Sequence, residues 1–166
     1  MPNRKIPTVE EVRQLPVQLS MAVPAEWEDR NGHVNVQYYL ALYELGGYLV
    51  LDDVGIDDAW LQTNNFGLFD MEHHLHYRAE ILVGDEVSAY NRILDLNHKR
   101  FHGMYFIVND SRDNLACTIE YISAGVGLGL RRTAPFPSEL FRGIEKQLAR
   151  HRLLSWTAPV CGKMRV

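Results

Sequence analysis

Residues 25–52 read AEWEDRNGHVNVQYYLALYELGGYLVLD, a polar loop that runs directly into a long apolar segment. Apolar residues recur at helical spacing, so residues 36–52 are predicted to form a helix with Asn35 at its N-cap. Further apolar residues lie off that stripe, and we therefore expect the helix to be buried on more than one side. Gly46 and Gly47 in mid-helix each cost about 1 kcal/mol relative to alanine, which indicates that another backbone passes close by.

Strands on either side of this helix predict an antiparallel sheet that wraps around it. The segment from Val17 to Val23 alternates between apolar and polar side chains until Pro24 ends the pattern. Turn residues separate the later strand candidates, and an amphipathic helix follows the last of them. The elements predicted after the central helix are strands at Phe66–Ile81, Glu86–Leu96, Arg100–Asn109 and Leu115–Leu128, and a helix from Ser138, its expected cap, to about His151. A single early helix within an antiparallel sheet indicates an α+β fold.

Length and composition limit the classes of protein to which the chain can belong. Its 166 residues suit one domain, which we place at residues 15–151, between a loose polar lead-in over 1–14 and a tail over 152–166. Lys and Arg number 17 against 21 Asp and Glu, and the net charge of −4 disfavours a nucleic-acid partner. Two cysteines are too few for a disulfide framework, and no stretch resembles a secretory leader or a bilayer span. We therefore expect a cytoplasmic protein without a membrane partner.

The loop before the central helix is where the sequence points to chemistry. Asp29 lies shortly before the helix start, where backbone N–H groups are unpaired and carry partial positive charge. Such N–H groups can hold the oxyanion that develops when a carbonyl is attacked, with Asp29 as the nucleophile or as the base that activates water. The alternative is an ordinary polar turn with an N-cap, because such loops commonly precede helices.

The same residues carry a family resemblance. The segment from Asp29 to Asn35 reads DRNGHVN, and with Tyr39 and Glu44 it resembles the D-x-x-G-H-x-N…Y…E signature of hotdog-fold acyl-CoA thioesterases of the 4-hydroxybenzoyl-CoA thioesterase type. The resemblance covers roughly residues 17–130. It implies the hotdog fold, in which an antiparallel sheet wraps one long central helix.

Longer stretches are similar to betainyl-CoA thioesterase-like proteins, which occur alone or fused to carnitine dehydrogenase. These stretches read VPAEWEDRNGHVNVQYYL, MEHHLHY, KRFHGMYF and RRTAPFPSEL, and the similarity reaches about His151. It implies hydrolysis of betainyl-CoA to betaine and CoA in carnitine metabolism, without any cofactor besides the CoA of the substrate. It also implies a homodimer, because hotdog sites need both subunits, and open sheet edges invite such pairing.

The resemblance assigns catalysis to the loop and to the first turn of the helix. Asp29 matches the catalytic aspartate, and the Val36 backbone N–H matches the donor to the thioester carbonyl. His33 and Asn35 match positions that shape the loop. Glu44 matches a helix glutamate that is either a second acid/base or, as we favour, a buried partner of the loop, because a carboxylate in a core needs a hydrogen-bond partner.

Substrate contacts are predicted at two further places. His98, Lys99 and Arg100 resemble the basic hairpin that contacts CoA phosphates, although charge alone equally fits a solvated hairpin tip. A trimethylammonium acyl group favours aromatic faces and a nearby carboxylate. The predicted acyl-binding residues are Trp27, Tyr39, Tyr43 and Glu72, with Asp70 on the same strand as Glu72. For the aromatic residues, plain core packing is the alternative.

A cluster of histidines is the sequence's one signal for a metal site. His73, His74 and His76 suggest a metal cluster, but strand alternation puts His74 and His76 on one face and His73 on the other. Because no cysteine or carboxylate lies at ligand spacing in the sequence, we expect no metal site. The alternatives that stay open are a thioesterase for another acyl-CoA, a hydratase on the same fold, and a non-catalytic acyl-CoA-binding hotdog protein.

Overall fold

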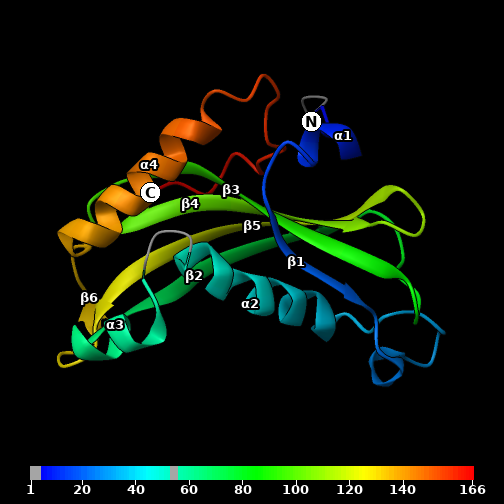
Figure 1. Cartoon of the computed structure of the whole chain (residues 1–166), viewed down its shortest axis with the longest axis horizontal. Coiled ribbons are helices and arrows are strands. Elements are labelled where there is room, and N and C mark those ends of the chain that lie inside the picture. Colours follow the sequence, from blue (N-terminus) through cyan, green and yellow to red (C-terminus); the bar gives the residue numbers. More distant parts are fainter. Residues whose placement is uncertain (1–4, 53–55) are drawn as a thin grey trace.

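The computed structural model describes residues 5–52 and 56–166, so the first four residues of the predicted lead-in lie outside it. One antiparallel sheet curls around one side of a long helix (Figure 1), which is the α+β hotdog arrangement that the sequence predicts. The strand order is β1-β3-β4-β5-β2, and the short β6 pairs with β5. The strands are β1 Val17–Ala22, β2 Phe66–Tyr77, β3 Glu86–Leu96, β4 Arg100–Asn109, β5 Asn114–Gly127 and β6 Arg132–Thr133.

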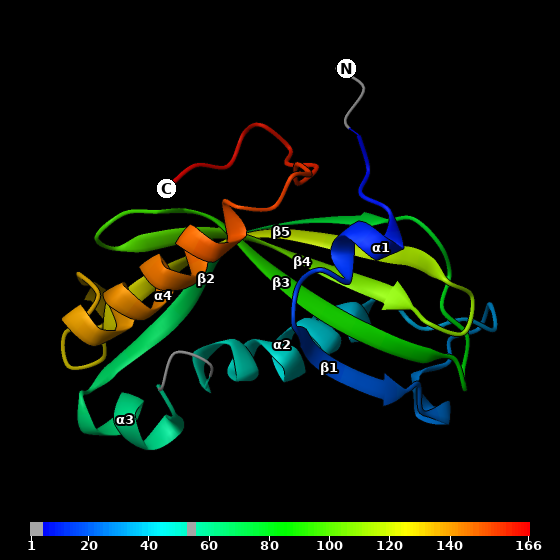
Figure 2. The same ribbon diagram turned by 45° about the horizontal axis from the view of Figure 1, so that its top comes forward.

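Helix α2, Gln37–Asp52, covers one face of the sheet, which we call the inner face (Figures 1 and 2). Leu42 and Tyr43 of this helix are buried in the main hydrophobic core together with sheet residues such as Tyr105. Leu40 is 38% exposed and Leu45 is 49% exposed. The expectation that the helix is buried on more than one side is therefore wrong for a single chain.

Gly46 packs against a side chain of the sheet rather than against another backbone. A Cβ at Gly46 would overlap the hydroxyl oxygen of Tyr105. A Cβ at Gly47 would meet nothing within 4 Å among the described residues. Only Gly46 is therefore required to be glycine, and the reason is the Tyr105 hydroxyl directly beneath α2.

Both ends of the described chain cover the opposite, outer face of the sheet (Figures 1 and 2). Helix α1, Val9–Val12, begins with a capping box at Thr8, and its two valines are buried in a second hydrophobic cluster with Phe106 and Trp156. The Arg92 guanidinium lies 4.1 Å from the centre of the Trp156 ring and donates to the Trp156 carbonyl at 2.8 Å. The lead-in is thus not loose, and the tail is packed by single anchoring residues that leave no periodic pattern in the sequence.

The short elements differ from the prediction. Helix α3, Asp58–Thr63, is capped by Asp57, whose side chain accepts from the Trp60 N–H at 2.7 Å, and its six residues are too few to show periodicity. Helix α4, Ser138–His151, has Pro137 rather than Ser138 at its N-cap, without a capping side chain. A 3-10 turn, η1 at Ala25–Trp27, precedes the Asp29 loop. None of the helices that the structure describes is long and apolar enough to span a bilayer.

Strand β2 ends at Tyr77 instead of the predicted Ile81. The N–H groups of Arg78 and Ala79 both donate to the Ala116 carbonyl, at 2.8 and 3.2 Å. Two donors on one acceptor break the regular ladder, so the chain leaves the sheet at this point. The residues that follow are therefore free to line a cavity beside α2.

Strand β2 also carries a β-bulge in its first half. The pairing with β5 shifts between Asp70 and Glu72, so that Met71 is the extra residue. Asp70 and His73 consequently both face α2, whereas Glu72 and His74 face the outer side. This arrangement confirms that His73 points away from the other two histidines of the strand.

Candidate active site

A tight loop holds Asp29 just ahead of helix α2. The Asp29 N–H donates to the His33 carbonyl at 2.9 Å, and the Gly32 N–H donates to the Asp29 carbonyl at 3.1 Å. Gly32 has a φ of +77°, a conformation that glycine adopts without a steric penalty. Glu28 and Val34 form a bridge at the base of the loop. The glycine of DRNGH therefore lets the chain reverse and fixes the direction of the Asp29 side chain.

The Asp29 carboxylate is oriented by its neighbours but stays accessible. Its Oδ1 accepts from the Asn31 N–H at 2.7 Å, and its Oδ2 lies 3.4 Å from Nδ1 of His33. The side chain of Asp29 is 18% exposed and that of His33 is 37% exposed. A carboxylate that is held on one side and open on the other can attack, or deprotonate, a molecule bound on its open side.

The start of α2 supplies a backbone donor next to this carboxylate. The Asn35 side chain accepts from the Gln37 N–H at 3.1 Å, which satisfies one of the unpaired donors of the first turn, as expected of a cap. The Tyr38 N–H donates to the Asn35 carbonyl at 3.0 Å. Among the described residues, no acceptor pairs with the Val36 N–H. This N–H is therefore available to a ligand at the positive end of the helix.

A cavity of about 430 Å³ opens beside these groups and collects most of the predicted catalytic residues. Asp29, His33, Val36 and Tyr39 line it. The Tyr39 ring lies edge-on to that of Tyr77, with the ring centres 5.0 Å apart. Burial, with smaller contributions from nearby anionic groups, raises the pKa of Tyr39 to about 12. The hydroxyl is therefore neutral at physiological pH, and the two rings offer aromatic faces to a bound group.

Three charged or aromatic residues of this cavity were not predicted from the sequence. Tyr77, Arg78 and Glu80 lie at the end of β2 and just beyond it, and they line the cavity opposite Asp29. The Arg78 Nε is buried and has no hydrogen-bond partner in the described part of the chain, and burial lowers the pKa of its guanidinium. The only sequence signal for these residues is the run of polar side chains that ends the strand. Their proximity to Asp29 depends on the tertiary fold.

Two residues predicted for the site lie elsewhere. Trp27 is buried in the core and stacks on Tyr38, with the ring centres 4.7 Å apart, and the Asp29 cavity does not include it. Glu44 is exposed, so the favoured role as a buried partner of the loop is wrong. Its position on α2 turns the carboxylate toward solvent at the rim of a second cavity.

This second cavity, also about 430 Å³, lies between α2 and the sheet and contains Tyr43. The Tyr43 hydroxyl donates to Asp70 Oδ2 at 2.8 Å, and Nε2 of His73 lies 3.1 Å from the same oxygen. Burial alone would raise the pKa of Asp70, but the bonds from His73 and Tyr43 outweigh it and lower that pKa. Burial raises the pKa of Tyr43. Asp70 and Tyr43 thus form a polar group of their own, separate from the Asp29 cavity.

The remaining predicted substrate contacts are distant from Asp29 within one chain. Glu72 faces the outer side of the sheet because of the β-bulge and lines neither cavity. In the β3–β4 hairpin, the N–H groups of Lys99 and Arg100 both donate to Asn97 Oδ1, which tightens the tip and leaves the basic side chains exposed. His98 stacks on Phe141 of α4.

The hairpin and the Asp29 cavity lie at opposite ends of the sheet. Arg100 pairs with Ala124, and Ala124 pairs with Phe69 of β2. Tyr77, which lines the Asp29 cavity, is about 26 Å farther along β2 at roughly 3.3 Å per residue. Helix α2 covers the inner face between these two points (Figure 2).

Residues 23–144 match the thioesterase-like superfamily. A betainyl-CoA thioesterase from Pseudomonas aeruginosa is 26% identical over 129 residues, which cover 78% of this chain and 81% of that relative. An L-carnitine dehydrogenase/betainyl-CoA thioesterase from Rhizobium meliloti is 25% identical over 118 residues, which cover 71% of this chain and 24% of that longer protein.

Solved structures share the fold at lower sequence identity. A hypothetical protein from Staphylococcus aureus, solved in complex with CoA, superposes with a TM-score of 0.79 at 21% identity and covers 92% of this chain and 96% of that one. A 1,4-dihydroxy-2-naphthoyl-CoA thioesterase from Synechocystis gives a TM-score of 0.68 at 18% identity, over 76% of this chain and 93% of that one.

Proposed function

Since this chain belongs to the thioesterase-like superfamily, we propose that it hydrolyses an acyl-CoA thioester in the cavity beside Asp29. One observation carries the proposal: an accessible carboxylate and the unpaired Val36 N–H line the same cavity at the start of α2. The relatives named betainyl-CoA thioesterases and the CoA complex of a structural neighbour support acyl-CoA as the substrate class.

The proposed reaction places the thioester carbonyl oxygen on the Val36 N–H. Charge develops on that oxygen when the carbonyl carbon is attacked, and the helix N-terminus stabilises it. Asp29 either attacks the carbon to give an anhydride that water then hydrolyses, or takes a proton from the water that attacks. In both routes the C–S bond breaks and the thiolate leaves without a dedicated acid, because a thiol has a pKa of only about 8.5.

We propose betainyl-CoA as the substrate, which requires a cation-binding group very near the reacting carbonyl. The nitrogen of betaine is two bonds from the carbonyl carbon, or about 2.5 Å. Tyr43 lies about 10 Å from Val36 along the axis of α2, at roughly 1.5 Å per residue. The cavity around Tyr43 and Asp70 is thus too far away in the same chain, and the acyl group belongs in the Asp29 cavity.

Three residues of the Asp29 cavity suit a trimethylammonium group. Tyr39 and Tyr77 offer aromatic faces, each worth roughly 0.5–2 kcal/mol to a cation depending on desolvation. Glu80 adds a carboxylate beside Tyr39. Arg78 lines the same cavity and opposes a cation, so selectivity depends on Glu80 and the two rings outweighing it.

We further propose that the active form is a cytosolic homodimer in which a second copy supplies the basic hairpin to each Asp29 cavity. Strand β2 is an edge strand, and Phe69 on it is 63% exposed, which favours pairing with another chain. Val36 and Leu45 add exposed apolar surface along the neighbouring α2. The separation of about 26 Å between the hairpin and the cavity in one chain supports a site shared by two chains.

Substitution of Asp29 tests the proposed reaction. Asp29→Asn keeps an oxygen that accepts from the Asn31 N–H, so the loop is expected to fold while turnover falls about 10²–10⁴-fold. The assay measures free thiol released from acyl-CoA. Glu28→Gln, which changes an exposed carboxylate next in the chain, is the matched control and should leave turnover unchanged. Near-normal turnover in a folded Asp29→Asn protein contradicts the mechanism.

Two substrates of nearly equal shape test the acyl group. Betainyl-CoA and 3,3-dimethylbutanoyl-CoA differ in a quaternary nitrogen against a quaternary carbon. A cation-selective cavity should favour betainyl-CoA at least about 10-fold in kcat/KM, which corresponds to about 1.4 kcal/mol. If both substrates are hydrolysed equally well, the protein is still a thioesterase but betainyl-CoA is not its preferred substrate. A long-chain acyl-CoA serves as the third substrate in the comparison.

A further inference from the structure

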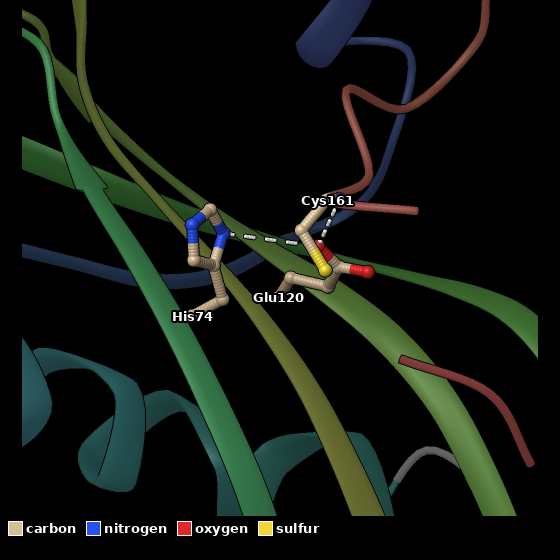
Figure 3. A group of neighbouring side chains, drawn as sticks. All are labelled: His74, Glu120 and Cys161. Carbon is tan, nitrogen blue, oxygen red and sulfur yellow. Dashed lines mark hydrogen bonds and ion pairs between the residues drawn. The ribbon is translucent and has the colours of Figure 1, made fainter. Parts of the chain in front are cut away.

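Three side chains that can bind a metal meet on the outer face of the sheet, away from the Asp29 cavity. His74 comes from β2, Glu120 from β5 and Cys161 from the segment that follows α4 (Figure 3). One ligand atom of each lies within 4.8 Å of the others. The His74 Nδ1 is 3.9 Å from Glu120 Oε2. The ligand spacing that the sequence lacks is therefore created by the fold.

The backbone explains how these residues come together. His74 and Glu120 are direct partners in the β2–β5 ladder, and the β-bulge at Met71 turns His74 to the outer side. Cys161 is carried back over the sheet by the segment that the buried Trp156 anchors. Gly162 has a φ of +75°, which turns the chain just after the cysteine. Each ligand thus sits on backbone that packing or pairing holds in place.

Glu120 is a buried carboxylate with a hydrogen-bond partner on each oxygen. Its side chain is only 1% exposed, and Nε2 of His102 lies 2.9 Å from Oε1. Its Oε2 accepts from the Cys161 N–H, and a second lone pair on that oxygen remains on the side of His74. The carboxylate is therefore fixed in place with Oε2 directed toward His74 and Cys161.

We propose that His74, Glu120 and Cys161 form a zinc site that fastens the C-terminal segment to the outer face of the sheet. Imidazole nitrogen, carboxylate oxygen and thiolate sulfur are the ligands that Zn²⁺ takes in proteins, whereas the thiolate disfavours Mg²⁺ and Ca²⁺. Bond lengths of about 2.0–2.3 Å place tetrahedral ligands roughly 3.3–3.8 Å apart. The observed atoms need to close by about 1.5 Å or less to reach that geometry, with water as the fourth ligand.

The surroundings of the three ligands fit the same metal. His102 holds the Glu120 oxygen that faces away from His74, as outer hydrogen-bond partners of ligating carboxylates do. The Lys163 N–H donates to Cys161 Sγ at 3.4 Å, which orients the sulfur. The site lies across the sheet from α2, so its role is to stabilise the fold and not to take part in thioester hydrolysis.

Zinc retention by the full-length protein tests the proposal. The protein is stripped with a chelator, dialysed against Zn²⁺, and analysed for bound metal by plasma emission. We expect one Zn²⁺ per chain in the wild type and loss of this stoichiometric binding in Cys161→Ser and in His74→Ala. His76→Ala is the matched control, because His76 shares the outer face of β2 but lies outside the cluster, and it should retain the metal.

Two further measurements separate a built site from a change in folding. Co²⁺ in place of Zn²⁺ should give a thiolate-to-metal charge-transfer absorption in the wild type that is absent in Cys161→Ser, with circular dichroism confirming that both proteins fold. Zn²⁺ should also slow proteolysis of the segment after α4 in the wild type and not in His74→Ala. The proposal is overturned if the wild type does not retain Zn²⁺. It is also overturned if Cys161→Ser and His74→Ala retain as much Zn²⁺ as the wild type.

Discussion

A heterodimer with Asp29→Asn on one chain and Lys99→Ala with Arg100→Ala on the other shows whether two chains build each site. If the basic hairpin serves the Asp29 cavity of the other chain, this heterodimer has one site with both defects and one intact site. If both parts serve the same chain, every site carries a defect. The distance of about 26 Å along β2 and the position of α2 between the two parts favour the first arrangement.

The magnitudes follow from the exposure of the hairpin. Lys99 and Arg100 are exposed, so each phosphate contact is worth about 0.5–1 kcal/mol, and loss of both should raise KM about 5–30-fold. Asp29→Asn removes nearly all turnover from its site. The shared arrangement therefore predicts about half of the wild-type kcat/KM for this heterodimer. The arrangement within one chain predicts about a tenth of the wild-type value or less.

The assay uses two affinity tags, sequential purification of the heterodimer, and thiol release at low salt, where exposed charges are least screened. The matched control carries all three substitutions on one chain of the heterodimer. That protein should have about a tenth of wild-type kcat/KM or less if sites are shared, and about half if they are not. High activity in the control and low activity in the first heterodimer would refute the shared site. A fully active monomer by light scattering would do the same.

Three other outcomes are expected. Glu80→Gln should lower kcat/KM for betainyl-CoA about 2–10-fold without affecting 3,3-dimethylbutanoyl-CoA, and an equal loss for both would argue against a contact with the cation. Trp156→Ala should reduce the free energy of unfolding in urea by about 3–5 kcal/mol, whereas Leu153→Ala, at an 85% exposed position, should change it little. Burial lowers the pKa of His151 to about 4, and its Nδ1 accepts from the Ile93 N–H at 2.9 Å, which requires the neutral ring. Because the unfolded chain takes up this proton near pH 6.5, unfolding free energy should fall by up to about 3 kcal/mol as pH drops from 6.5 to 4, and His151→Gln should flatten that decline.

The long elements and the Asp29 loop could be predicted from the sequence because their signals are local. The helix after Asn35 shows its period over several turns, and recognisable turn residues separate the long strands. The glycine in DRNGH marks its own turn. Helices α1 and α3 are too short to show a period, and the C-terminal segment packs through isolated anchors such as Trp156.

The acyl-binding residues were harder to predict, because proximity across the fold decides them. Tyr39 lies beside Asp29, while the equally aromatic Trp27 is buried in the core. Counting in steps of two puts Asp70 and Glu72 on one face of the strand, but a single inserted residue sends Glu72 to the other. Nothing in the composition of the strand reveals that insertion.

The β-bulge at Met71 sets which side chains each half of β2 presents to the two faces of the sheet. Since β2 is an edge strand, the extra residue disturbs its ladder with β5 and no second ladder within the described chain. Deletion of one codon there would exchange the faces of one half of the strand, bringing His73 out and His74 in, while the loop carrying Asp29 stays unchanged. A single insertion or deletion could therefore remove the outer cluster, but it would also turn Tyr77 away from the Asp29 cavity.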